Sequence, residues 1–231
     1  SGEVGEFTQR YRTTEATPIN LVLRARFNPG LDPGWYGAMM EVINNVSLLS
    51  VILAGAFLIR ERERGTIEHL LVMPVTQAEI VIGKIWPTAL VVFAAAIFAI
   101  TVVVQIWLAI PVAGSLWLLM LGLLLQLFAT TSLGILLATI AGSMPQFGLL
   151  LMLVLFPLQV LAGGTTPVEN MPGFIRTFMT AAPDTHFVAL ARAVLFRGAG
   201  IDTIWPQILA LAVIGTAFFS LSLWRFRTSL R

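Results

Sequence analysis

Cysteine is absent from this sequence of 231 residues, and charged residues make up only 11% of it. Without cysteine the chain can form no disulfide, no thiolate nucleophile and no cysteine-ligated metal site. Its two histidines, His69 and His186, lie far apart in the sequence, so we expect no histidine metal site either. Soluble domains average about a quarter charged residues. The low charge, together with 57% apolar residues, therefore indicates an integral membrane protein.

The net charge of +2 is too small to indicate a nucleic-acid partner. Basic residues cluster instead beside hydrophobic stretches, as the topology of membrane proteins requires. The sequence begins with Ser1, and residues 1–37 are polar without the features of a signal peptide. We therefore expect a piece of a longer protein, whose upstream part carries these residues across the membrane.

Five apolar stretches are long enough to cross a bilayer, because a helix needs about 20 residues to span the hydrocarbon core. They cover residues 38–59, 86–110, 115–140, 145–163 and 204–224. Several prolines and glycines, and the tryptophans, fall at or near their ends. Spans this long and continuously apolar must be helices. The sequence thus predicts an all-α polytopic membrane domain over residues 38–231.

Residues 1–37 are predicted to be the end of an extracytoplasmic domain. Residues 19–27 roughly alternate apolar and polar side chains, which is typical of a strand. The Pro- and Gly-rich residues 28–34 then break regular structure.

The distribution of basic residues favours one orientation of the spans. Counted by parity, Lys and Arg number seven on each side. Those at 60–64 and at the C-terminus directly adjoin span ends, where the positive-inside bias is strongest. We therefore predict that residues 60–84 and the C-terminus face the cytoplasm.

Residues 165–203, on the outer side, contain two short amphipathic patterns, neither long enough to span. The apolar positions of the first are Met171, Phe174, Ile175 and Phe178. Those of the second are Phe187, Leu190, Ala191, Val194 and Leu195. Asp184 or Thr185 can cap the start of the second helix, and Gly198 suits its end. We expect both helices to lie at the interface or to dip into the membrane and return.

The cytoplasmic stretch Arg60–Lys84 is charged and amphipathic. Its alternating Arg-Glu run extends the first span beyond the lipid, with Arg60–Glu63 and Glu61–Arg64 pairs at helical spacing. Gly65 interrupts this helix. The spacing then predicts a short helix that starts at Thr66 and ends before Pro74.

The remainder of this stretch is a Thr76-x-x-Glu79 capping box, which starts the helix of the second span. The short helix before it carries one apolar face, made by Ile67, Leu70 and Leu71. Such a face suits an interfacial loop lying on the membrane as well as a docking element for a cytoplasmic partner, and the pattern alone does not separate them.

Two segments together resemble a known family. They are GTIEHLLVMP, residues 65–74, and LAGGTTPVENMP, residues 161–172, followed by the two short helices and the last span. In this order they resemble the permease subunits of ABC-2 type exporters, in particular bacterial drug-export permeases similar to the membrane half of the ribosome-associated ABC ATPase. The resemblance covers about residues 27–231. It implies six spans in the full chain, the first of which is missing here.

The resemblance also implies roles for particular residues. Residues 65–74 would contain the coupling helix, which receives motion from an ATP-binding subunit, and residues 163–172 with the two short helices would form an outer gate. The implied ATPase-coupling residues are Glu61, Glu63, Gly65, Thr66, Ile67, Glu68, His69, Leu70, Leu71 and Pro74. The implied outer-gate residues are Gly163, Gly164, Thr165, Thr166 and Pro167.

Polar residues inside the predicted spans are few. Glu41, Asn44 and Asn45 share one helical arc near the outer end of the first span. Polar groups at this depth face a cavity or a partner helix, so either a substrate path or interhelical bonding fits them. The candidate path residues are Glu41, Asn44, Asn45, Phe156 and Gln159. For the isolated glutamines we favour helix–helix hydrogen bonds; they are Gln105, Gln126 and Gln159.

A small residue recurs every four positions in the third span, which predicts a close-packing face. The residues are Thr130, Gly134, Ala138 and Gly142. No ATP site is present, because Gly83-Lys84 lacks both the earlier glycine and the following Ser or Thr of a Walker A loop.

The resemblance implies a permease without catalytic or metal-binding residues in the bacterial inner membrane. ATP and Mg²⁺ would be held by a partner ABC ATP-binding subunit or domain, and a second permease half would complete a homo- or heterodimer. The expected cargo is hydrophobic or amphiphilic, exported by alternating access. One alternative is an ATP-independent channel or carrier. Another, an intramembrane enzyme, is weaker because Glu41 is the only acidic residue in the predicted spans.

Overall fold

The computed structural model describes residues 33–65, 76–107, 114–162 and 172–229. These residues belong to one compact unit, Asp32–Arg231. Within the described ranges the chain is helical and contains no strand, which confirms the all-α prediction. The predicted strand at residues 19–27 lies outside the described residues.

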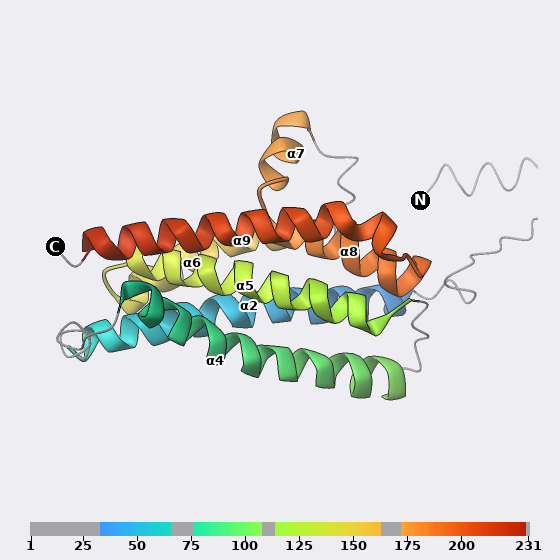
Figure 1. Cartoon of the computed structure of the whole chain (residues 1–231), viewed down its shortest axis with the longest axis horizontal. Coiled ribbons are helices and arrows are strands. Elements are labelled where there is room, and N and C mark those ends of the chain that lie inside the picture. The colour runs from blue at the N-terminus through green and yellow to red at the C-terminus, as the bar shows by residue number, and fades with distance from the viewer. Residues whose placement is uncertain (1–32, 66–75, 108–113, 163–171, 230–231) are drawn as a thin grey trace, which may run out of the picture. The chain divides into compact units, whose positions relative to one another are not determined.

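Five long helices form a bundle (Figure 1). They are α2 (Pro33–Glu63), α4 (Gln77–Phe98) with its π-helical continuation η1 (Ala99–Trp107), α5 (Leu116–Ile140), α6 (Met144–Leu161) and α9 (Ile201–Ser229). Two shorter helices, α7 (Gly173–Met179) and α8 (Pro183–Arg197), precede α9. The five long helices are each long and apolar enough to cross a membrane, so the predicted spans are confirmed.

The first helix starts earlier than predicted, whereas the second starts where its capping box predicts. α2 begins at Pro33 rather than near residue 38. Proline suits the first position of a helix, because the N–H groups of the first turn have no partner within the helix and proline has no N–H to leave unbonded. α4 begins at Gln77, directly after the predicted N-cap Thr76, and continues through Pro87 into the second span. The predicted capping box is confirmed, because Thr76 Oγ1 accepts from Glu79 N at 3.3 Å and Thr76 N donates to Glu79 Oε2 at 2.6 Å.

α5 lies at the centre of the bundle and packs against α2, α4, α8 and α9 (Figure 1). The predicted close-packing face is confirmed at Gly134, where a Cβ would lie 2.5 Å from the carbonyl oxygen of Val51 on α2. Thr130 and Ala138 on the same face are buried, whereas Gly142 is exposed beyond the end of the helix. Only glycine at position 134 lets the two backbones approach this closely.

The outer helices expose apolar side chains that a soluble protein would bury. On α6 the side chains of Leu149, Met152, Leu153 and Phe156 are each at least 70% exposed. Such a surface is stable when lipid covers it, which agrees with the composition and length of the five spans. The predicted location in a membrane is therefore supported by the fold as well.

α8 enters the bundle, while α7 projects from its side (Figure 1). The five predicted apolar positions of α8 are all buried, and Gly198 ends the helix with a φ of 63°. The predicted side-chain cap is wrong, because the N-cap residue is Ala182 and makes no side-chain cap bond. Pro183 occupies the first position, and Asp184 instead points into the bundle, where it bonds Ser47 near the middle of α2. α8 thus packs between the spans, which agrees with the second of the two predicted arrangements.

Candidate functional site

The last turn of α2 bonds to three other helices. Its neighbour on α4 is Lys84, whose ammonium forms an ion pair with the carboxylate of Glu61. The α4 side of this pair is well buried, with the Lys84 side chain 13% exposed. The ion pair thus joins α2 to α4 beside the predicted coupling segment.

The next residue, Arg62, binds the C-terminal end of α5. Its Nη1 donates to the carbonyl oxygens of Ala138, at 3.3 Å, and Ala141, at 3.1 Å. The last carbonyls of a helix have no partner within the helix and carry partial negative charge. A guanidinium is therefore well suited to this position.

Glu63 completes the contacts by binding the N-terminal end of α6. Its Oε1 accepts from the backbone N–H of Met144 at 3.0 Å, where the helix end favours negative charge. Glu61, Arg62 and Glu63, with these partners, are called here the α2 end cluster. Glu61 and Glu63, which the sequence spaces for pairing with Arg64 and Arg60 along α2, thus also reach Lys84 of α4 and the start of α6.

The coupling segment itself lies largely outside the described residues. The residues concerned are Thr66, Ile67, Glu68, His69, Leu70, Leu71 and Pro74. Its two flanks are described: Gly65 ends the α2 turn with a φ of 71°, a conformation that favours glycine. Thr76 begins the capping box of α4. The segment is therefore attached to two helices that the Glu61–Lys84 pair holds together.

The interior of the bundle contains a polar cluster that links α2, α5 and α8. Ser47 Oγ donates to Asp184 Oδ1 at 2.6 Å, and Gln126 Nε2 donates both to Asp184 Oδ1 and to Ser47 Oγ, the latter at 2.9 Å. One turn further along, Ser50 Oγ donates to Thr130 Oγ1 at 2.6 Å. All five side chains are at most 3% exposed. We call these five residues the buried polar cluster.

Asp184 is the only carboxyl group of the buried polar cluster. Burial raises the pKa of the Asp184 carboxyl, and the hydrogen bonds from Ser47 and Gln126 lower it in part. The sequence predicted helix–helix bonding for Gln126, which the structure confirms. It did not predict the burial of Asp184, which was a candidate for capping the start of α8.

The candidate path residues do not form one site. Asn45 Nδ2 donates to Glu41 Oε1 at 2.7 Å, and both residues line an open cavity of about 360 Å³ between α2 and α4–η1. The backbone carbonyl oxygen of Asn44 accepts from Gln159 Nε2 of α6 at 3.2 Å. Phe156 is 70% exposed on α6. The predicted outer-gate residues, 163–167, lie outside the described residues.

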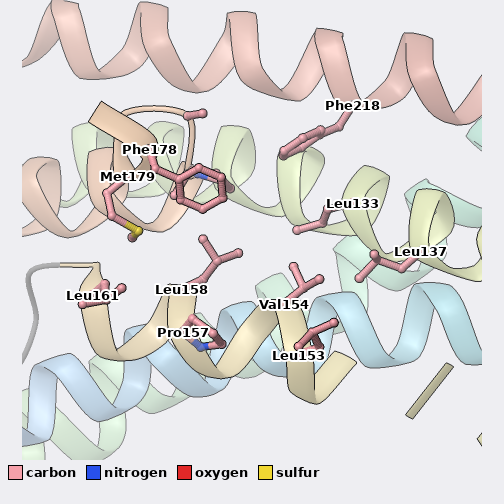
Figure 2. A pocket seen from close by; sticks show the side chains of 13 residues that line it. Leu133, Leu137, Leu153, Val154, Pro157, Leu158, Leu161, Phe178, Met179 and Phe218 are labelled. Atoms are coloured by element: carbon pink, nitrogen blue, oxygen red, sulfur yellow. The ribbon is translucent and has the colours of Figure 1, made fainter. Parts of the chain in front are cut away.

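A second cavity, of about 470 Å³, lies between α5, α6, α9 and the α7–α8 turn (Figure 2). Its walls are almost entirely carbon. Leu153, Val154 and Leu158 of α6 approach it from one side and Phe218 of α9 from the other, with Phe178 at one end. No single sequence pattern indicates this cavity, because four separate segments form it. We call it the apolar cavity.

In the part of the chain that the structure describes, no group of three or more His, Asp or Glu side chains could hold a metal ion. The site features described above are contacts between helices and two cavities.

Comparison with known proteins identifies the family of the chain. Residues 8–224 match the family described as ABC-2 family transporter protein. The chain is 52% identical over 230 residues to the inner membrane transport permease YhhJ of Escherichia coli K12, covering 100% of this chain and 62% of that protein. It is 30% identical over 209 residues to the probable multidrug ABC transporter permease YbhR of the same organism, covering 87% of this chain and 55% of that protein.

The chain thus spans little more than half the length of these relatives. The name of the first agrees with the predicted location in the bacterial inner membrane. The family match extends over nearly the whole chain and includes all five spans. On these grounds the protein belongs to the ABC-2 family of transporter proteins.

Proposed function

We propose that this chain is the membrane part of an ATP-driven ABC exporter, which moves hydrophobic or amphiphilic molecules out of the cytoplasm by alternating access. The family supports the role of a transport permease rather than an enzyme. Relatives named as probable multidrug ABC transporter permeases support the ATP-driven part of the proposal. In this proposal a separate ATP-binding subunit or domain binds ATP and Mg²⁺, and a second permease half completes the transporter.

The α2 end cluster is the observation that carries this proposal. A partner pressing on residues 66–75 would act directly on the end of α2 through Gly65 and on the start of α4 through Thr76. The Glu61 ion pair, the Arg62 bonds and the Glu63 bond connect α2 to α4, α5 and α6. Movement at this end of the bundle would therefore reach four spans together. ATP can drive the change because the partner's nucleotide state favours one arrangement over the other.

The apolar cavity supports the proposed class of cargo. Ligand pockets typically enclose about 300–1,000 Å³ and are lined mainly by apolar side chains, and the volume of about 470 Å³ lies in this range. An apolar group can enter it without leaving a buried polar group unpaired. A strongly charged cargo would lose its hydration there without compensation. Glu41 and Asn45, which line the other cavity, remain candidates for contact with a polar end of the cargo.

The proposal can be tested with the full-length permease and its ATP-binding partner in inside-out vesicles. We expect uptake of a fluorescent apolar dye to require hydrolysable ATP. Leu70→Asp and Leu71→Asp should abolish both uptake and its coupling to ATP hydrolysis. Thr203→Asp adds the same charge at an exposed position near the start of α9 and should leave both intact.

Two results would contradict the proposal. Dye movement without nucleotide would favour the channel or passive carrier. Full ATP-coupled uptake in the Leu70 and Leu71 variants would exclude the docking role of residues 66–75.

A further inference from the structure

Asp184 is a carboxyl group inside the bundle, bonded to residues in the middle of two spans. It is 3% exposed, and its bonding partners Ser47 and Gln126 are at most 1% exposed. These two partners belong to the middle of α2 and of α5, far from either end of the bundle. Ionisable residues at such depth are costly and mark functional sites by default.

No basic side chain within the described ranges is recorded in contact with Asp184. α5 and α6 carry no charged residue at all. Among the acidic residues of α2, Glu41 is the nearest in sequence to Ser47, and it is exposed and bonded to Asn45. α9 carries its charged residues near its two ends, Asp202 at the start and Arg225 towards the other end.

The titratable groups on the two short helices do not supply a counter-charge either. His186 Nε2 lies 2.8 Å from the carbonyl oxygen of Thr180, and Arg192 lies eight residues further along α8, about 12 Å at the rise of a helix. Arg176 and Arg197 are exposed. The start of α8 and two hydrogen bonds favour the anion, but they supply no full positive charge. A buried carboxylate without one is expected to take up a proton instead.

Gln126 supplies a second, independent observation. Its Nε2 donates to Asp184 Oδ1, while its own Oε1 is buried and has no hydrogen-bond partner. A protonated carboxyl has an O–H group that can donate to an amide oxygen while its carbonyl oxygen accepts from the amide N–H. The neutral acid thus offers the donor that Gln126 lacks, and acid and amide can bond each other twice.

We propose that Asp184 is a reversible proton-binding site, whose neutral form holds α8 in the bundle against α2 and α5 and whose ionised form releases it. On release the O–H bond breaks, its electron pair stays on the carboxylate, and the proton passes to water that reaches Asp184 as α8 withdraws. The ligand of this site is therefore a proton. The proposal depends on the geometry of α8 and holds whether or not the chain is an exporter.

The absence of cysteine from these residues makes the proposal testable by thiol labelling. The full-length protein is reconstituted in vesicles, with any cysteine outside these residues replaced by serine. Ala191→Cys places a probe at a fully buried position of α8. Gly200→Cys, at an exposed position with open space around it, corrects for the pH dependence of the thiol itself. Ala54→Cys, fully buried on α2, reports any general unfolding.

We expect the labelling rate of Ala191→Cys relative to Gly200→Cys to rise with pH. The rise is about tenfold per pH unit where docked α8 is protonated and released α8 is ionised. Asp184→Asn, which stays neutral and keeps an amide to bond Gln126, should make this ratio low and independent of pH. The Ala54→Cys probe should remain unlabelled throughout.

Ser47→Ala keeps the test decisive if Asp184→Asn does not fold. It removes a donor that stabilises the ionised form in the docked state, so the pH at which labelling reaches its plateau should increase. A purely structural role for Ser47 would change the level of labelling without moving this pH. A pH-independent ratio in the parent protein, a pH dependence that persists in Asp184→Asn, or a response to Na⁺ at constant pH would each overturn the proposal.

Discussion

The guanidinium of Arg62 lies 3.1 Å from the carbonyl oxygen of Ala141, so the end of α2 caps the end of α5. The same Nη1 also donates to the carbonyl of Ala138, one turn earlier. Glu63, the next residue, binds the first turn of α6. The short connection between α5 and α6 is therefore held on both sides by consecutive residues of one helix, and that helix leads directly into the proposed coupling segment.

Replacing Arg62 tests whether these bonds transmit movement. Arg62→Ala should lower stability by about 1–3 kcal/mol, because it leaves two helix-end carbonyls without a charged donor. It should also reduce ATP-dependent dye uptake more than it reduces ATP hydrolysis. Arg62→Lys keeps the charge but loses the planar donor group, so we expect an intermediate effect. Measurement combines thermal unfolding with uptake in vesicles.

Arg64→Ala is the matched control, because Arg64 is exposed beyond the end of α2. It removes the same charge two residues away and should leave both uptake and stability unchanged. Equal loss of coupling in the two variants would show that net charge, and not the Arg62 contacts, matters at this end of the bundle.

The close approach of α2 and α5 gives a prediction about packing. At Gly134 a Cβ would lie 2.5 Å from the carbonyl oxygen of Val51, and backbone atoms cannot move aside as a flexible side chain can. Gly134→Ala should therefore lower the unfolding free energy by about 1–3 kcal/mol. Gly83→Ala, on the exposed face of α4 with open space around it, should be neutral or stabilising by up to about 1 kcal/mol. If the Gly134 variant unfolds at the same denaturant concentration as the parent, the helices are not in this contact.

The features predicted correctly from the sequence depend on neighbouring residues. Span length and hydropathy fix the five long helices, and the Thr76 capping box forms within four residues. The apolar spacing of α8 likewise predicted its buried face. Pro87 lies inside α4, a position that a membrane helix tolerates.

The features that sequence reasoning missed depend on segments far apart in the chain. Arg62 binds backbone carbonyls on a helix that begins more than fifty residues later, and backbone acceptors carry no sequence signal. Asp184 resembles a helix cap until α8 folds back against Ser47, 137 residues away. The apolar cavity has its walls on four elements, so no single pattern predicts it.

The apolar cavity predicts a selective effect on cargo. Val154 is half-buried on α6 and lines the cavity. Val154→Trp should fill part of this space and raise the apparent KM for an apolar dye by roughly tenfold, which corresponds to about 1.4 kcal/mol of binding energy. Leu149→Trp, on the same helix at a position 71% exposed, should leave the KM unchanged. The measurement is dye uptake at several concentrations, with ATP hydrolysis recorded in parallel. Equal KM values for the two variants would exclude this cavity as the binding site.

The buried carboxyl of Asp184 predicts a specific dependence of stability on pH. Burial raises its pKa in the folded protein, so the native state binds the proton more tightly than the unfolded chain does. Stability falls with increasing pH over the range in which the native state holds more protons than the unfolded state. The stabilisation that proton binding at Asp184 contributes is complete below the ordinary pKa of an aspartic acid. It is lost as the pH rises through the raised pKa of Asp184 in the folded protein. Asp184→Asn cannot titrate at this position and should lack this decline.

The measurement is the unfolding midpoint of the parent and of Asp184→Asn from about pH 4 to about pH 9, a range that begins near the ordinary pKa of an aspartic acid. The difference between the two profiles isolates Asp184, because the other titrating groups are common to both proteins. We expect the parent to lose stability relative to the variant as the pH increases. Parallel profiles would mean that Asp184 has the same proton affinity in both states, and a difference of opposite sign would mean that the bundle stabilises the anion. Either result would contradict a neutral Asp184 in the folded bundle.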